Sequence, residues 1–127
     1  MREIKFRAWV KPWKWMDFPT SISIDDSGHI EGVRGYGGDY PYTDIELMQY
    51  TGLNDKNGRE IYESDIVRNP YKYAQPHVSE VFIEGGNTYL SGEDLSTGGD
   101  MLLCDYADQC EVIGNIYKNP DLLEASK

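Results

Sequence analysis

The strongest constraint in this sequence is the alternation of apolar and polar residues over short runs that end at glycine-rich turns. In residues 4–10, the side chains of Ile4, Phe6, Ala8 and Val10 alternate with those of Lys5, Arg7 and Trp9. A period of two places alternate side chains on opposite faces of an extended chain, so it predicts a half-buried strand and not a helix. The first ten residues therefore predict a strand.

The same pattern predicts two hairpins and a late strand. Residues 21–24 and 29–33 alternate on either side of a turn at 25–28, and residues 78–83 and 88–90 flank a turn at 84–87. Residues 111–117 are strand-like around Gly114, where we expect a bulge or a close approach of other atoms. With 13 glycines and short strands, the chain predicts a mainly β barrel or sandwich.

Helix signals are confined to the last quarter of the chain. Asn119 offers an N-cap and Pro120 suits the first helical position, so residues 120–125 predict a short C-terminal helix. A second short helix is expected around residues 105–109. The length of 127 residues fits one domain, and we expect a single domain over 1–127. A sub-division is conceivable between N-terminal strands with an aromatic loop at 1–46 and a barrel core with the terminal helix at 47–127.

Charge is distributed unevenly along the chain. The chain has 12 basic and 22 acidic residues, and its net charge of −10 disfavours broad binding to nucleic acid or anionic membrane. The start of the chain is basic, whereas no lysine or arginine occurs between Lys72 and Lys118. That span carries a candidate acidic face made of Glu80, Glu84, Glu93, Asp94, Asp100, Asp105, Asp108 and Glu111.

The sequence carries no recognisable catalytic motif, and we predict no enzyme activity, metal or other cofactor. The histidines are His29 and His77, and nothing local marks Cys104 as a nucleophile activated by either of them. Cys104 and Cys110 lack the spacing of a zinc site. Acidic residues are plentiful, which leaves a two-carboxylate site open without positive support. No apolar run resembles a signal peptide or a membrane span, so we expect a cytoplasmic protein with both cysteines as free thiols.

Residues 47–67 are the most organised stretch. Asn57-Gly58 is a strong turn signal, and Asp55-x-Asn57-Gly58 matches the centre of a calcium loop. However, the first position of such a loop is Leu53, and its twelfth position, where a glutamate is expected, is Ser64, so the calcium interpretation fails. Residues 62–67 are expected to form a turn that leads into a strand.

Aromatic residues supply the candidate contact sites. Trp9, Trp13 and Trp15 lie among Arg7, Lys11 and Lys14, the mixture of rings and cations that binds single-stranded nucleic acid. Tryptophans in a small β protein also commonly cover the edge of the core under lysine stems. Residues 35–42 are predicted to form an exposed aromatic loop that offers Tyr36, Tyr40 and Tyr42 to a partner.

Three blocks of this sequence resemble the YopX family of phage and prophage proteins. The blocks are Ile-Lys-Phe-Arg-Ala-Trp at 4–9, Tyr-Thr-Gly-Leu-x-Asp-x-Asn-Gly-x-x-Ile-Tyr at 50–62, and Val-Ile-Gly-Asn-Ile-Tyr with Asn-Pro-x-Leu-Leu at 112–123. The resemblance implies a mainly β, SH3-like barrel with extra N-terminal strands and hairpins, and it brings no catalytic residues. Ser64 stands where the family usually has glycine, which questions a positive φ at that position.

Three functions follow as hypotheses from these features. The leading one is a non-enzymatic β module that binds a protein partner or associates with itself as a homo-oligomer. The second is an acidic mimic of nucleic acid that occupies a host DNA-binding protein through residues 73–117. The third is a binder of single-stranded nucleic acid through the Trp/Lys N-terminal arm.

Overall fold

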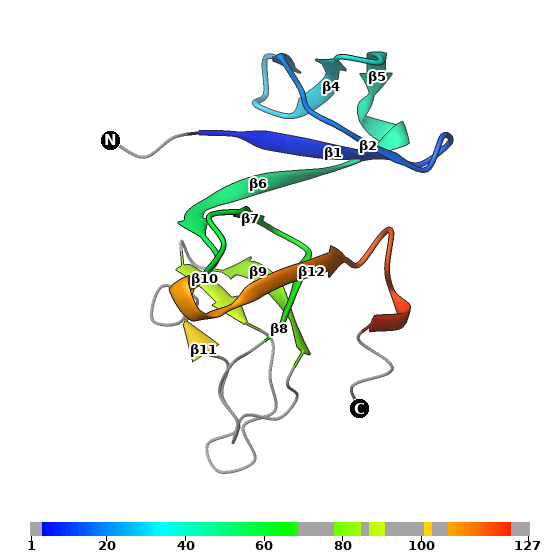
Figure 1. Cartoon of the computed structure of the whole chain (residues 1–127). Helices are drawn as coiled ribbons and strands as arrows, with labels where there is room; N and C mark the ends of the chain where they lie inside the picture. Colours follow the sequence, from blue (N-terminus) through cyan, green and yellow to red (C-terminus); the bar gives the residue numbers. More distant parts are fainter. Residues whose placement is uncertain (1–3, 69–77, 85–86, 91–100, 103–106, 123–127) are drawn as a thin grey trace. The chain divides into compact units, whose positions relative to one another are not determined.

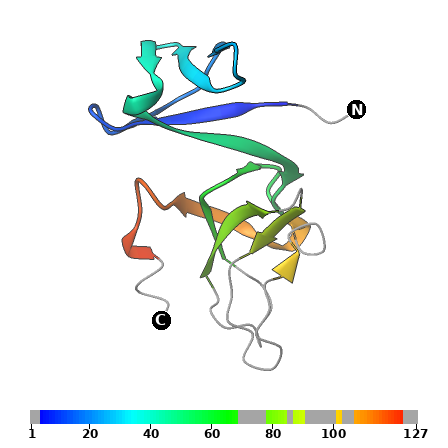
Figure 2. The ribbon, with the colours of Figure 1, turned by 180° about the vertical axis from the view of Figure 1, so that it is seen from behind.

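The computed structural model describes residues 4–68, 78–84, 87–90, 101–102 and 107–122, and the side chains of 101 and 102 are not described. Antiparallel strands make up most of these residues (Figures 1 and 2), which confirms the mainly β prediction. The chain divides into two compact units, one covering Ile4–Gln49 and the other beginning at Tyr50. We call them the N-terminal unit and the C-terminal unit.

The predicted first strand forms the centre of the N-terminal unit. Strand β1 (Phe6–Val10) pairs antiparallel with β2 (Trp15–Asp17) on one side and with the first half of β6 (Ile45–Asn54) on the other. Both faces of β1 are covered, because Arg7 is buried as well as Ala8. The Arg7 Nε donates a hydrogen bond to the sulfur of Met48 at 3.4 Å, so the basic face of the alternation lies against protein rather than solvent.

A three-stranded sheet completes this unit. Strands β3 (Ser21–Ile24) and β4 (Ile30–Gly35) form the predicted hairpin, and β5 (Gly38–Pro41) follows β4 antiparallel before the short helix η1 (Tyr42–Asp44). The buried core shared by these elements contains Ala8, Val10, Val33, Tyr40 and Ile45, with Ile22 and Leu47 packed against it.

The segment 35–42 is mostly exposed, as expected, but it is not a loop: it contains a tight turn, strand β5 and the start of η1. Gly35 and Gly38 pair with each other at the end of a tight hairpin, and Gly38 adopts a φ of +141°. The strand that follows is short of core-forming residues, so only Tyr40 signals it. Tyr40 lies opposite Val33 and is 7 % exposed, which removes it from the set of candidate contact residues.

The C-terminal unit is built on a curled five-stranded antiparallel sheet of order β11-β10-β9-β8-β12. The strands of this sheet are β8 (Asp65–Arg68), β9 (Val78–Glu84), β10 (Asn87–Leu90), β11 (Met101–Leu102) and β12 (Glu111–Asn115). The unit also contains the short helix η3 (Ala107–Gln109) and strand β7 (Glu60–Tyr62), which pairs with the end of β6. The hairpin expected over 78–90 is confirmed as β9 and β10. The curl of the sheet is consistent with the SH3-like barrel that the resemblance implies.

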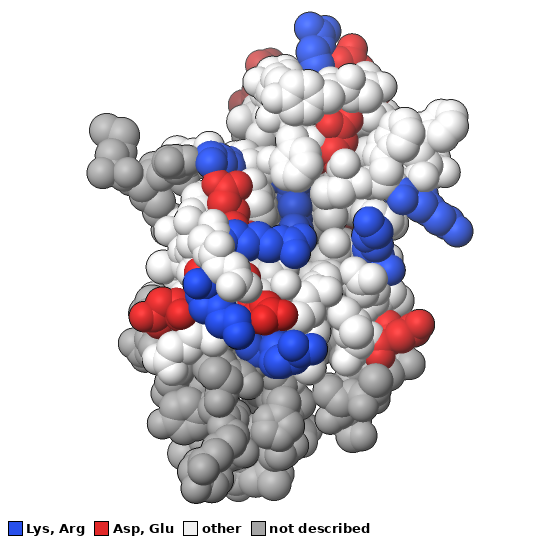
Figure 3. Space-filling model, viewed as in Figure 1, with Lys and Arg blue, Asp and Glu red and all other residues white. Residues whose placement is uncertain are grey.

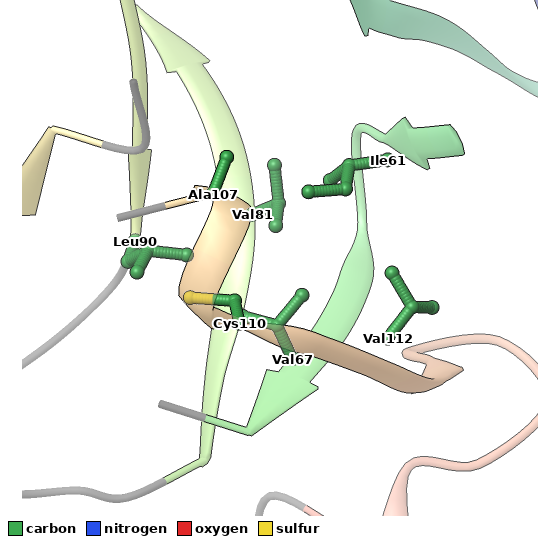
Figure 4. Close-up of a cluster of buried hydrophobic side chains, with 7 residues drawn as sticks. All are labelled: Ile61, Val67, Val81, Leu90, Ala107, Cys110 and Val112. Atoms are coloured by element: carbon green, nitrogen blue, oxygen red, sulfur yellow. The ribbon is translucent and has the colours of Figure 1, made fainter. Parts of the chain in front are cut away.

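The core of the C-terminal unit is formed by side chains from five strands, from η3 and from Cys110 next to η3 (Figure 4). It contains Ile61, Val67, Val81, Leu90, Ala107, Cys110 and Val112, and Leu53 packs against it. Val67 on β8 and Val81 on β9 are completely buried, as are Ile61 on β7 and Cys110.

Gly114 sits at a bulge, as expected. The register of β12 against β8 shifts between Val112 and Gly114. A Cβ at Gly114 would lie 2.5 Å from Oδ1 of Asn119, so the close approach is made by that side chain. Of the predicted C-terminal helix, residues 121 and 122 are helical, and residues 123–125 lie outside the described residues. Of the helix expected over 105–109, residues 107–109 are described and form the short helix η3.

Ser64 adopts the left-handed conformation that glycine normally supplies, with a φ of +68°. The turn it occupies is fixed by two backbone hydrogen bonds, from Ser64 N–H to Val81 O at 2.8 Å and from Ile116 N–H to Ser64 O at 3.0 Å. Position 64 therefore has the positive φ that glycine favours, although its residue is serine.

Replacing Ser64 with glycine is expected to raise the free energy of unfolding by roughly 0.5 to 1 kcal/mol, because glycine adopts a positive φ without the steric cost of a Cβ. Urea denaturation of the purified variant measures the change. The matched control is Ser23→Gly in the extended strand β3. This substitution should lower the free energy of unfolding, because glycine there adds only flexibility to the unfolded chain. Equal destabilisation by both substitutions would contradict this account.

Candidate binding surface

Asp17, the last residue of β2, is the polar centre of the N-terminal unit. Its buried carboxylate accepts hydrogen bonds from the Tyr36 and Gly37 backbone N–H groups at 3.0 and 2.9 Å and from the Tyr40 hydroxyl at 2.9 Å. A fourth comes from the Phe18 N–H at 2.7 Å. A single carboxylate thus fixes the turn between β4 and β5 against β2.

The turn can approach this carboxylate because it contains two glycines. A Cβ at Gly35 would lie 2.6 Å from the Asp17 carboxylate, and a Cβ at Gly37 would lie 2.6 Å from the Tyr40 hydroxyl oxygen. Burial acts to raise the pKa of Asp17, but the donated hydrogen bonds outweigh it and the net pKa lies below its ordinary value. Asp17 is therefore a charged structural centre rather than a proton donor at neutral pH.

Three exposed aromatic side chains lie on the segments that Asp17 holds together. Trp13 and Trp15 stack with ring centroids 5.8 Å apart and an angle of 19° between the planes. They are 67 % and 45 % exposed, and Tyr36, on the turn bonded to Asp17, is 82 % exposed. A Cβ at Gly37 would meet the Trp15 ring at 3.3 Å, so that ring lies against the same turn. We call Trp13, Trp15 and Tyr36 the aromatic patch.

The remaining aromatic candidates do not join the aromatic patch. Trp9 is half-buried on β1, and Tyr40 is in the core. Tyr42 is exposed, but it belongs to η1. The sequence pattern did not separate the exposed rings from the buried ones.

The two lysines of the β1–β2 turn differ in their partners. Lys11 Nζ forms an ion pair with Glu46 at 3.1 Å. Lys14 stands at a φ of +56° and is exposed, and among the described residues no carboxylate pairs with it. On the face shown in Figure 3, basic and acidic side chains are interspersed. Lys14 places one positive charge between the two exposed tryptophans in sequence.

The candidate acidic face is only partly described, because Glu93, Asp94, Asp100 and Asp105 lie outside the described residues. Glu84 and Asp108 are exposed, and Glu80 is half-buried with its pKa raised by burial. Glu111 is paired with Lys56 at 3.2 Å and with Arg68 at 3.5 Å. At Glu111 the negative charge is therefore offset within the chain.

Asp55 holds a turn through its carboxylate. Its Oδ1 accepts the N–H groups of Asn57 and Arg59, and its Oδ2 accepts the N–H of Val112 on β12, each at 2.9 Å. Burial acts to raise the pKa of Asp55, but these bonds and the charge of Arg59 lower it overall. Among the described residues, no group of three or more His, Cys, Asp or Glu side chains is placed to bind a metal ion.

The same turn occurs in the N-terminal unit. Asp25 Oδ1 accepts the N–H groups of Ser27 and His29, and Gly28 adopts a φ of +86° where Gly58 has +80°. In both turns the glycine N–H donates to the aspartate carbonyl at 3.0 Å. Asp-x-Ser/Asn-Gly is thus a recurring hairpin turn, and its repetition in the sequence was a signal that could have been used.

Comparison with known proteins supports the resemblance found in the sequence. The family model described as YopX protein matches residues 5–124. The chain belongs to the YopX family. Among curated proteins, none matches this YopX-family chain.

Two solved structures share the fold of this YopX-family chain. Protein EF1440 from Enterococcus faecalis is 30 % identical, with a TM-score of 0.71 over 97 % of this chain and 99 % of that one. Protein yopX from Bacillus subtilis is 23 % identical, with a TM-score of 0.63 over 97 % of each chain. Each comparison covers 97 % of this chain and so includes residues of both units.

Two further observations on this YopX-family chain concern its cysteines and the length of its helices. Cys110 is a free, fully buried thiol, and its pKa is raised to about 11 by burial and by the charges of Asp108 and Asp55. Cys104 lies outside the described residues. In the part of the chain that the structure describes, no helix is long and apolar enough to cross a membrane.

Proposed function

We propose that this YopX-family chain is a non-enzymatic, cytoplasmic binding module that docks a protein partner on the aromatic patch. The observation that carries the proposal is the stacked, exposed pair of Trp13 and Trp15 on a hairpin fixed by Asp17. Tryptophan is enriched among the residues that dominate binding energy at protein interfaces. Rings held rigidly before binding lose little conformational entropy when they are covered.

The partner expected from this chemistry has an apolar depression with an acidic rim. The rings of Trp13 and Trp15 supply apolar area, and Lys14 supplies a nearby positive charge. A cytoplasmic setting is supported by the free thiol of Cys110, since reducing compartments keep thiols unpaired.

The double variant Trp13→Ala/Trp15→Ala tests the proposal. Immobilised wild-type chain is expected to retain a defined partner from a lysate of the source cells at about 1 M salt, because an apolar interface is little affected by screening. The double variant should lose the partner while keeping its circular dichroism spectrum. Tyr42→Ala, which removes an exposed ring from η1, is the matched control and should bind normally. Retention of the partner by the double variant would refute the proposal.

A fluorescence titration with a single-stranded oligonucleotide separates this function from nucleic-acid binding. We expect unchanged tryptophan emission at low salt, because the net charge of −10 repels a polyanion. Quenching of the Trp13 and Trp15 emission, absent in the double variant, would favour single-stranded nucleic acid as the ligand and overturn the protein partner.

A further inference from the structure

Strand β3 is an exposed edge that carries no charge. It lies at one end of the sheet of order β3-β4-β5, and residues 18–24 contain no ionisable side chain. Ser21 and Ser23 are exposed, and two large apolar side chains near the ends of the segment, Phe18 and Ile24, are 47 % and 61 % exposed. In a chain with a net charge of −10, this segment is a local exception.

The opposite edge of the same sheet is protected in the usual way. Strand β5 carries Asp39, which pairs with Arg34 at 2.8 Å, and it ends in Pro41. Charged side chains and proline are the devices by which natural sheets prevent another strand from adding to an edge. Strand β3 has neither between Ser21 and Ile24, so its edge can accept a further strand.

We propose that β3 pairs antiparallel with β3 of a second copy of this chain, which joins two three-stranded sheets into one. A two-fold axis at Ile22 sets Ser21 of one copy opposite Ser23 of the other, and Ile24 opposite Thr20. Residues of equal parity then face each other, so the isoleucine row and the serine row both continue across the junction. Such a self-complementary contact is what a closed two-fold dimer requires.

A second copy fits this edge better than a charged foreign peptide because the contact needs no complementary charge. Each copy has a net charge of −10, so electrostatic repulsion between the two chains opposes formation of the dimer. Added salt screens that repulsion and should strengthen the dimer. This dependence is the reverse of what a contact based on ion pairs shows.

Light scattering coupled to size-exclusion chromatography tests the dimer. At high protein concentration and about 0.5 M salt, where the Debye length is only a few Å, we expect a mass approaching twice the 14.5 kDa of one chain, falling towards one chain on dilution. Ser23→Lys should abolish the dimer, because lysine on an edge strand would have to lose its hydration when a second strand is added there. Ser27→Lys adds the same charge on the turn of the same hairpin and should leave the dimer intact. A dimer that survives Ser23→Lys, or a monomer at every concentration, overturns the proposal.

Hydrogen exchange of the unaltered chain gives a second test, which does not depend on the folding of any variant. Peptides covering 18–26 should become more protected as the concentration rises, and peptides covering β5 should not. Equal behaviour of the two edges would refute pairing through β3. The variant Trp13→Ala/Trp15→Ala should still dimerise, so failure of the dimer and failure of the proposed partner site are separate results.

Discussion

Replacing Asp55 with alanine is expected to lower the free energy of unfolding of the C-terminal unit by about 3 kcal/mol. The carboxylate accepts three backbone N–H groups, and one of them, from Val112, joins the turn to a strand 57 residues away in sequence. Removing it leaves the buried Val112 donor without its acceptor, and hydrogen bonds to an ionised group are stronger than neutral ones. Urea denaturation followed by circular dichroism measures the loss.

Asp25→Ala is the matched control for that experiment. The turn around Asp25 has the same two local hydrogen bonds, but the Asp25 side chain is 37 % exposed, and within the described residues its carboxylate accepts no hydrogen bond from a distant strand. Water can replace the lost acceptor there, so we expect a loss of about 1 kcal/mol or less. Equal losses for the two variants would show that the bond to Val112 contributes nothing.

Lowering the pH of the unaltered chain should reproduce the loss of stability expected for Asp55→Ala. The pKa of Asp55 is lowered in the folded state, so its contribution is complete above the ordinary value of 3.8 and is lost as the pH falls through the folded pKa. The stability of Asp55→Ala should therefore fall less steeply below pH 4 than that of the parent chain.

Replacing Asp17 with alanine is expected to lower the stability of the N-terminal unit by about 2 to 3 kcal/mol and to release the aromatic patch. Without the carboxylate, the Tyr36 and Gly37 N–H groups and the Tyr40 hydroxyl lose their acceptor. Near-ultraviolet circular dichroism should lose intensity from the tryptophans, because the turn against Trp15 is no longer fixed. Thermal unfolding measures the stability change.

Asp39→Ala is the control in this unit. Asp39 also bonds a neighbouring side chain, Arg34, but both groups are exposed, so the loss should stay below about 1 kcal/mol. An unchanged tryptophan spectrum in Asp17→Ala would contradict the role given to the carboxylate. Gly37→Ala offers an independent perturbation of the same contact and should shift the spectrum in the same direction.

Much of the fold was predictable because most strands carry their own alternation. The hairpins β3–β4 and β9–β10 follow from the residues on each side of a turn, and the bulge at Gly114 follows from a glycine inside a strand. Strand β5 was missed because Tyr40 is its only core residue. Its burial depends on a hydrogen bond to Asp17, 23 residues away, which no local pattern reveals.

The candidate site was predictable in part for the same reason. Trp9, Trp13 and Trp15 were candidate contact residues, and Trp13 and Trp15 are exposed. The group that organises them, Asp17, sits between Met16 and Phe18 without any motif, and its partners Tyr36 and Gly37 come from a different hairpin. Long-range contacts of single polar residues leave no periodic signal in one sequence.

The two aspartate turns also determine where this chain can change its length. In each, the aspartate N–H, its carbonyl and its Oδ1 are all engaged within the five residues 25–29 or 55–59, so neither turn has a spare residue. An insertion of one residue would reverse the parity of the following strand and turn its apolar row towards water. Evolution of this scaffold by insertion and deletion should therefore spare these two turns.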